Sequence, residues 1–174
     1  MEAELYDVPR VLPEQFDIIY TGVGALGWLP DIAGWARVVA ALLAPGGLVY
    51  VREAHPLLWA LDDERDDEEL VLRYPYFETD QPLQFQETTT YSAGDTPVSH
   101  ATIYAWNHGI AETVQGVIDA GLLLTSLHEH QETEWQALPQ LVQTPAGSWT
   151  LPADRGGLVP LMYSLTAVKP PPTR

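Results

Sequence analysis

Short apolar runs alternate with an amphipathic segment in the first third of the chain. Residues 16–21, Phe-Asp-Ile-Ile-Tyr-Thr, are rich in β-branched and aromatic side chains and end at a glycine, which is typical of a buried parallel strand. Apolar residues then recur at helical spacing between the start signal Pro30-Asp31 and the stop signal Ala44-Pro45-Gly46-Gly47. Residues 48–53 form a second apolar run. Residues 16–53 therefore predict a strand, helix, strand unit with a right-handed parallel crossover, and hence an α/β fold.

The pattern becomes irregular after residue 54. An acidic run at 62–69 predicts a solvated loop rather than a cation site, because like charges in sequence usually stay in water. Residues 84–91 and 98–106 are rich in Thr and aromatic side chains and flank Ser-Ala-Gly-Asp, so they predict an antiparallel β-hairpin. A helix over 110–120 and strands over 122–129 and 161–168 follow, whereas 131–157 predicts a loop with a short helix at most. We expect residues 1–174 to form one domain in which 54–108 is an insertion.

Composition narrows the possible partners. The chain has 174 residues, 46% of them hydrophobic, which suits one globular domain. Its formal net charge of -16, with only 8 Lys and Arg, argues against nucleic acid and anionic membranes as partners. The absence of cysteine excludes disulfides and thiolate metal sites. No apolar run reaches the roughly 18 residues that a membrane span requires, and a cytoplasmic location is expected.

The glycines that follow the first strand match a dinucleotide-binding pattern. Residues 22–27 read G-x-G-x-x-G, and Glu53 ends the next strand, where an acidic group can hold a ribose. The pattern requires its third glycine to lie at the start of a helix that faces the pyrophosphate. Here Trp28-Leu29-Pro30-Asp31 delays the helix by about a turn. A dinucleotide site therefore remains an alternative interpretation.

A longer stretch carries a more specific signal. The run at 16–21, Trp28-Leu29-Pro30-Asp31, Leu-Leu-Ala-Pro-Gly-Gly at 42–47 and Val-Arg-Glu-Ala-His-Pro at 51–56 occur in this order. Together they resemble the fourth strand, the following helix and the fifth strand of class I methyltransferases dependent on S-adenosylmethionine. The resemblance implies a Rossmann-like sheet that is mostly parallel with an antiparallel last strand. It also implies S-adenosylmethionine as cofactor and methyl transfer to a small-molecule acceptor.

The sequence departs from this family in its first part. The family's acidic residue and glycine-rich turn after the first strand have no counterpart before Phe16. We therefore expect a truncated fold that comprises only the C-terminal half of the family's domain. If each strand and helix unit takes about 30 residues, the three missing units amount to roughly 90 residues. Such a half would expose a strand edge and part of a sheet face, so self-association as a homodimer or larger homo-oligomer is expected, together with weak or absent binding of S-adenosylmethionine and impaired catalysis. A non-catalytic oligomeric half-domain is the alternative function.

Ligands in open α/β sheets bind beyond the carboxyl ends of the strands, and this position selects the site residues. The resemblance implies that the methionine part of the cofactor lies against the backbone after the first strand: Tyr20, Thr21, Gly22, Val23 and Gly24. His55 is predicted as proton acceptor, because neutral imidazole is available at cellular pH. His108, which follows the hairpin, is predicted to contribute to acceptor specificity. A structural role is the alternative for each histidine.

Four further residues are predicted to contact the acceptor or the sulfonium: Trp28, Glu53, Trp59 and Trp106. Aromatic rings attract cations and form apolar walls, although a tryptophan also commonly belongs to the core. No metal site is predicted. His128 and His130 point to the same side of a strand, but the sequence offers no evident third ligand.

Overall fold

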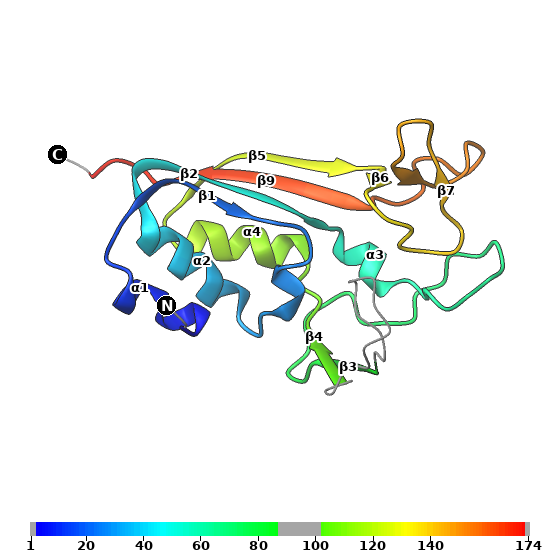
Figure 1. Cartoon of the computed structure of the whole chain (residues 1–174), viewed down its shortest axis with the longest axis horizontal. Helices are drawn as coiled ribbons and strands as arrows, with labels where there is room; N and C mark the ends of the chain where they lie inside the picture. The colour runs from blue at the N-terminus through cyan, green and yellow to red at the C-terminus, as the bar shows by residue number, and fades with distance from the viewer. Residues whose placement is uncertain (1–2, 87–101, 173–174) are drawn as a thin grey trace, which may run out of the picture.

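The computed structural model describes residues 3–86 and 102–172 of the chain. A four-stranded sheet with the order β1-β2-β9-β5 forms its centre (Figure 1). Its strands are β1 (Phe16–Thr21), β2 (Leu43–Ala54), β9 (Met162–Val168) and β5 (Leu123–His130). β1 and β2 pair in parallel, and β9 is antiparallel to both of its neighbours. The predicted α/β fold is confirmed: the sheet is mixed, with β1, β2 and β5 running in one direction and the last strand, β9, antiparallel to its two neighbours.

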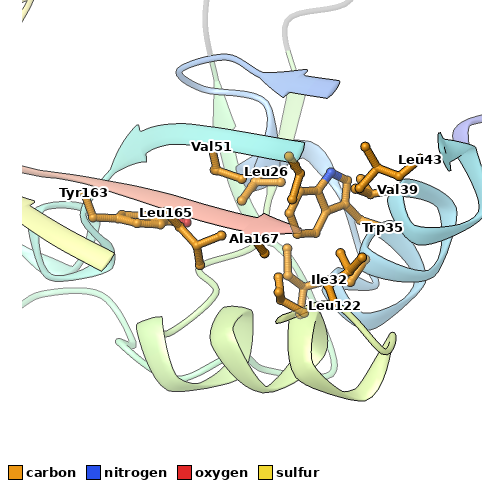
Figure 2. Close-up of a cluster of buried hydrophobic side chains, with 13 residues drawn as sticks. Leu26, Ile32, Trp35, Val39, Leu43, Val51, Leu122, Tyr163, Leu165 and Ala167 are labelled. Atoms are coloured by element: carbon orange, nitrogen blue, oxygen red, sulfur yellow. The ribbon is translucent and has the colours of Figure 1, made fainter. Parts of the chain in front are cut away.

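Two helices cover one face of this sheet (Figure 1). α2 (Ile32–Leu42) begins as the sequence predicts, because the Asp31 carboxylate accepts a hydrogen bond from the Gly34 amide at 2.6 Å. α4 (Ile110–Asp119) packs beside it. Figure 2 shows the buried side chains between these helices and the strands, among them Trp35, Val51 and Leu165. Burial of each such side chain contributes about 1.5–3 kcal/mol, so this layer is the main core of the fold.

The opposite face of the sheet is open along β1. Ile18, Tyr20 and Leu123 lie on it and are 67%, 61% and 60% exposed. The strand register places Ile18, Leu48, Val168 and Leu123 in one row across the four strands. Among the described residues, no element covers this face, and the outer edge of β1 has no partner strand. The sheet therefore presents apolar side chains and an unpaired edge at the same place.

Several short elements were not predicted. The chain begins with η1 (Leu5–Asp7) and α1 (Val8–Val11), which lie against α2. α3 (Pro56–Ala60) follows β2 directly, and η2 (Leu26–Trp28) lies between β1 and α2. Residues 131–157 contain strands rather than a short helix: β6 (Glu132–Thr133), β7 (Val142–Gln143) and β8 (Trp149–Thr150) form a small sheet. Two-residue strands leave no periodic pattern, which explains the wrong prediction.

An antiparallel strand pair lies at the outer ends of the predicted hairpin, whose remaining residues, 87–101, lie outside the described residues, so the hairpin itself stays a prediction. β3 (Leu83–Gln86) pairs with β4 (Thr102–Ala105), with Leu83 opposite Ala105 and Gln86 opposite Thr102. Its proposed turn at residues 92–95 lies outside the described residues. Among the described residues, no helix is long and apolar enough to cross a membrane.

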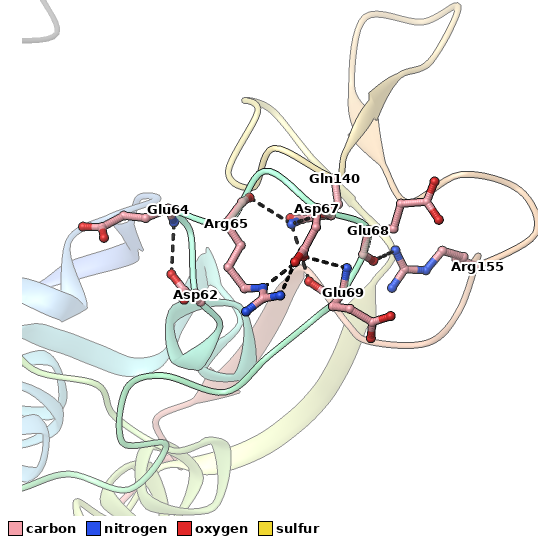
Figure 3. Close-up of polar contacts among 8 residues, drawn as sticks. All are labelled: Asp62, Glu64, Arg65, Asp67, Glu68, Glu69, Gln140 and Arg155. Atoms are coloured by element: carbon pink, nitrogen blue, oxygen red, sulfur yellow. Dashed lines mark hydrogen bonds and ion pairs between the residues drawn. The ribbon is translucent and has the colours of Figure 1, made fainter.

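The acidic run at 62–69 is an ordered loop (Figure 3). Arg65 pairs with Asp67, and Arg155 donates a hydrogen bond to the carbonyl of Glu68. The Gln140 side chain donates to the carbonyls of Arg65 and Asp67 at 3.1 and 2.9 Å. The hydrogen bond from Arg65 lowers the pKa of Asp67. Arg65, Arg155 and the Gln140 amide therefore hold this loop in the part of the chain that the structure describes.

Candidate functional site

A cavity of about 370 Å³ opens beyond the carboxyl ends of β1 and β2, where α/β sheets usually bind ligands. This volume lies in the range of small-molecule sites, about 300–1,000 Å³. The cavity is bounded by the loop after β1, the end of β2, α3, the segment before β3, and the β3-β4 pair. The residues that line it are Val23, Gly24, Gly27, Trp28, Glu53, Leu58, Trp59, Leu61, Asp63, Tyr74, Leu83, Phe85, Ile103, Ala105, Trp106, Asn107 and Ala137.

Glu53 anchors the loop that follows β1. One carboxylate oxygen accepts hydrogen bonds from the amides of Gly24 at 2.6 Å and Ala54 at 2.8 Å, and the other accepts from Leu26 at 3.1 Å. The residue is 4% exposed. Hydrogen bonds to a charged acceptor are among the stronger ones in proteins, about 1.5–3 kcal/mol each. Glu53 therefore lines the cavity, but its carboxylate is committed to fixing the backbone of the loop.

The same arrangement weighs against the dinucleotide interpretation. Gly27 lies in η2, and α2 begins only at Ile32, so the third glycine does not open a helix. Glu53, the acidic group that would hold a ribose, already accepts three backbone hydrogen bonds. The third glycine thus lacks the position that the dinucleotide pattern requires, and the acidic group is engaged by the backbone of the loop after β1.

Aromatic side chains make up much of the cavity wall. Tyr74 and Phe85 meet edge to face with ring centroids 5.6 Å apart, and the ring of Trp59 lies 6.2 Å from that of Trp135. Such pairs fix the orientation of rings at little entropic cost. The wall is therefore apolar and preformed.

One backbone hydrogen bond joins the residues after β4 to the loop after β1, and the Asn107 side chain joins them to α3 and to the segment before β3. The Trp106 amide donates to the Gly27 carbonyl at 2.9 Å. The Asn107 side chain donates to the carbonyls of Pro56 and Pro75 at 2.9 and 3.0 Å. Residues 54–108, which the sequence sets apart as an insertion, thus contribute one side of the cavity.

The structure brings six of the predicted site residues to the cavity, two from the cofactor set and all four from the acceptor set: Val23, Gly24, Trp28, Glu53, Trp59 and Trp106. Tyr20, Thr21 and Gly22 do not line it. Tyr20 lies on the open face of the sheet, where its ring stacks on Tyr50 at 5.8 Å. Alternate residues of a strand point to opposite faces, so a run of consecutive strand residues cannot all face one ligand.

His55 lies elsewhere than predicted. It follows β2, but its ring is 4% exposed, packs against Tyr163 and does not line the cavity. Nδ1 accepts a hydrogen bond from the Leu57 amide at 3.0 Å and so caps α3, while Nε2 lies 2.9 Å from a Glu129 carboxylate oxygen. Burial lowers the pKa of His55, and the Glu129 carboxylate partly opposes this effect. Both ring nitrogens are engaged, which supports a structural role.

Replacing His55 by asparagine is expected to flatten the pH dependence of stability between about pH 5 and 7. Because the folded-state pKa lies below the ordinary value near 6.5, the unfolded chain binds more protons and stability falls as the pH drops below that value. Asparagine retains an N-cap acceptor but does not titrate. Urea denaturation of both proteins at pH 7.5 and 5.5 measures the difference. An equal loss of stability in both would contradict this assignment.

His108 is also buried and does not line the cavity. Nε2 donates to the Leu29 carbonyl at 2.7 Å, and Nδ1 lies 2.7 Å from a carboxylate oxygen of Glu78. Glu112 completes a cluster whose ligand atoms lie within 4.8 Å of one another. Burial raises the pKa of Glu112, as do the hydrogen bond and the negative charge of Glu78. His108 therefore joins α4 to the loop before α2 instead of contacting the cavity.

Sequence reasoning missed several lining residues. Asp63 belongs to the acidic run, and Tyr74 and Phe85 belong to the segment around β3. The hairpin pattern was the available signal, since alternate residues of β3 and β4 face the same side: Leu83, Phe85, Ile103 and Ala105. No pattern in the sequence predicts that the acidic loop lies beside the cavity.

No family model matches the sequence, and no curated protein matches it. Solved structures, however, are similar to it in fold. A protein assigned as an S-adenosylmethionine-dependent methyltransferase from Listeria monocytogenes is similar over 97% of this chain and 68% of its own, with 16% identity and a TM-score of 0.58. A methyltransferase of the same class from Mesorhizobium loti matches over 89% of this chain and 62% of its own, with 18% identity and a TM-score of 0.54.

A third structure is the glycopeptide N-methyltransferase MtfA in complex with S-adenosylmethionine. It matches over 98% of this chain and 64% of its own, with 14% identity and a TM-score of 0.50. The chain therefore has the fold of the class I S-adenosylmethionine-dependent methyltransferases, as the sequence resemblance predicts. It spans about two thirds of the length of these three proteins.

Proposed function

We propose that this chain binds S-adenosylmethionine and transfers its methyl group to a small-molecule acceptor. The observation that carries the proposal is the cavity at the carboxyl ends of β1 and β2 in a methyltransferase fold. The structural neighbours are methyltransferases of this class, and one of them is a complex with the cofactor. The chain's net charge of -16 further supports a small molecule rather than a nucleic acid as substrate, and a cytoplasmic location suits this function.

Val23 and Gly24 fit a cofactor at the loop after β1. Gly24 has a φ of +80°, and a Cβ at this position would meet no atom within 4 Å, so the loop backbone faces open space. Glu53 holds that loop in a fixed conformation and places a negative charge beside the cavity. S-adenosylmethionine supplies an activated methyl group on a sulfonium, whose positive charge aromatic rings and carboxylates attract.

The wall of the cavity favours an acceptor with an apolar or aromatic body. Trp28, Trp59 and Trp106 line it together with aliphatic side chains of β3 and β4. Methyl transfer depends mainly on holding donor and acceptor in line, which a rigid apolar wall can achieve. Asp63 is the lining carboxylate that is not committed to the loop after β1, and we propose it as proton acceptor for an oxygen or nitrogen nucleophile.

A second copy of the chain is the proposed partner at the open sheet face. Ile18 and Tyr20 are largely exposed beside the unpaired edge of β1. Unpaired edges and exposed apolar side chains favour association. The homo-oligomer would cover both at once.

The cofactor proposal is tested by filling the cavity. Val23 lines it and is 41% exposed, so Val23→Trp is expected to weaken binding of S-adenosylhomocysteine at least about tenfold by occupying its space. Val142→Trp makes the same change at an exposed position in β7, away from the cavity, and is the matched control. Isothermal titration calorimetry of both variants and the wild type measures the effect.

NAD is titrated in parallel to test the dinucleotide alternative. A folded wild-type chain that binds NAD but not S-adenosylhomocysteine would refute the proposal in favour of that alternative. A folded chain that binds neither would favour the non-catalytic oligomeric half-domain, which the open sheet face supports.

A further inference from the structure

We propose that Glu78, His108 and Glu112 form a binding site for one divalent transition-metal cation, with Zn²⁺ preferred. The three side chains come from different parts of the chain: the segment before β3, the residues after β4, and the first turn of α4. One ligand atom from each lies within 4.8 Å of the others. The site is separate from the proposed cofactor cavity, because none of the three residues lines it.

The orientation of the His108 imidazole suits a metal ligand when the ring is neutral. The Leu29 carbonyl can only accept, so the hydrogen bond at 2.7 Å requires a hydrogen on Nε2. Neutral imidazole carries one hydrogen, and Nδ1 then presents its lone pair toward Glu78. Metal-binding histidines commonly donate their second nitrogen to a backbone carbonyl in this way. The ring is buried, so its orientation is fixed before any ligand arrives.

A proton or a cation must lie between the facing atoms. Nδ1 and a Glu78 oxygen lie 2.7 Å apart, and an ionised carboxylate has no hydrogen to donate. Glu112 adds a second, partly buried carboxylate whose ligand atom lies within 4.8 Å of the other two. Among the described residues, the charged groups that act on Glu112 are Glu78 and His108. One divalent cation balances the charges of two carboxylates, whereas a proton on His108 balances only one of them.

One imidazole and two carboxylates form a ligand set that suits Zn²⁺ and Mn²⁺ better than Mg²⁺, which prefers oxygen ligands alone. Zn²⁺ binds such nitrogen and oxygen sites more tightly than Mn²⁺. A bound cation would fix the segment before β3 to α4 and, through the His108 hydrogen bond, to the loop before α2. Its role would be structural and independent of the methyltransferase proposal.

Metal-free full-length protein is titrated with ZnCl₂, MnCl₂ and MgCl₂ by calorimetry, and its thermal unfolding is followed with each salt. We expect one equivalent of Zn²⁺ to bind more tightly than Mn²⁺, with Mg²⁺ weakest, and to raise the unfolding temperature. Glu112→Gln keeps the size of the side chain but loses a charged ligand, and it is expected to weaken Zn²⁺ binding at least about tenfold. Glu78→Gln is the second test and is expected to have a similar effect.

Two control variants exclude other sites. His128→Asn with His130→Asn removes the histidines of β5, and Glu68→Gln removes a carboxylate of the acidic loop. Both are expected to bind Zn²⁺ as the wild type does. The site is refuted if the folded wild type binds no Zn²⁺, or if Glu112→Gln and Glu78→Gln bind it unchanged.

Discussion

Glu53→Gln is expected to lower the free energy of unfolding by about 2–3 kcal/mol and to weaken binding of S-adenosylhomocysteine by about tenfold or more. The carboxylate accepts hydrogen bonds from the amides of Gly24, Leu26 and Ala54. A glutamine side chain has one acceptor oxygen, and its NH₂ group would face an amide hydrogen instead of accepting from it. The loop that bounds the cavity would then lose its fixed conformation. Urea denaturation and calorimetric titration measure the two effects.

Glu14→Gln is the matched control for this substitution. Glu14 is exposed, and the change removes the same charge from a chain whose net charge is -16. Surface substitutions usually change stability by less than about 0.5 kcal/mol. Equal effects of the two variants would mean that net charge, rather than the anchored loop, decides stability.

Replacing Ile18 and Tyr20 together by lysine is expected to weaken self-association at least about 100-fold. Burial of a large apolar side chain is worth about 1.5–3 kcal/mol, and each copy in a homodimer would lose two of them. Both side chains lie on the open face beside the unpaired edge of β1, and both are more than half exposed. Sedimentation velocity over a range of concentrations measures the equilibrium. Added salt should strengthen association of the wild type, because two acidic chains repel each other.

The control for this pair is Ile118→Lys with Leu158→Lys. Both residues are exposed, one on α4 and one in the loop before β9, and the change in charge is the same. We expect this variant to associate as the wild type does. A wild-type chain that stays monomeric at all concentrations would exclude the proposed homo-oligomer.

The regular part of the fold could be predicted from sequence because its elements are long enough to show a period. β1 has the predicted bounds, and α2 begins at the predicted cap. α4, β5 and β9 lie within one or two residues of their predicted ranges. β2 begins earlier than predicted, since Leu43 pairs with Phe16 although Ala-Pro-Gly-Gly follows it. The short α3 was missed because five residues show no helical period.

The cavity lies where the sequence predicts the site, but the contacts of the predicted residues agree only in part with the roles predicted for them. Trp28, Trp59 and Trp106 line the cavity because each follows or lies in an element at the carboxyl edge of the sheet. Glu53 is at the expected position, yet its partners are backbone amides. His55 caps α3, and His108 contacts Leu29 and Glu78. Side-chain direction at the end of a strand depends on contacts between distant segments, which sequence spacing does not report.

The residues after β4 and the loop before α2 are joined at two successive points. Trp106 donates to the Gly27 carbonyl, and His108 donates to the Leu29 carbonyl. Two hydrogen bonds two residues apart on each segment form a short ladder that resists hinge motion between them. This side of the cavity boundary is therefore fixed, whereas the segment from Leu61 to Tyr74 on another side contains the exposed acidic loop. Any change in the shape of the cavity when a ligand binds is therefore expected from that segment rather than from the residues after β4.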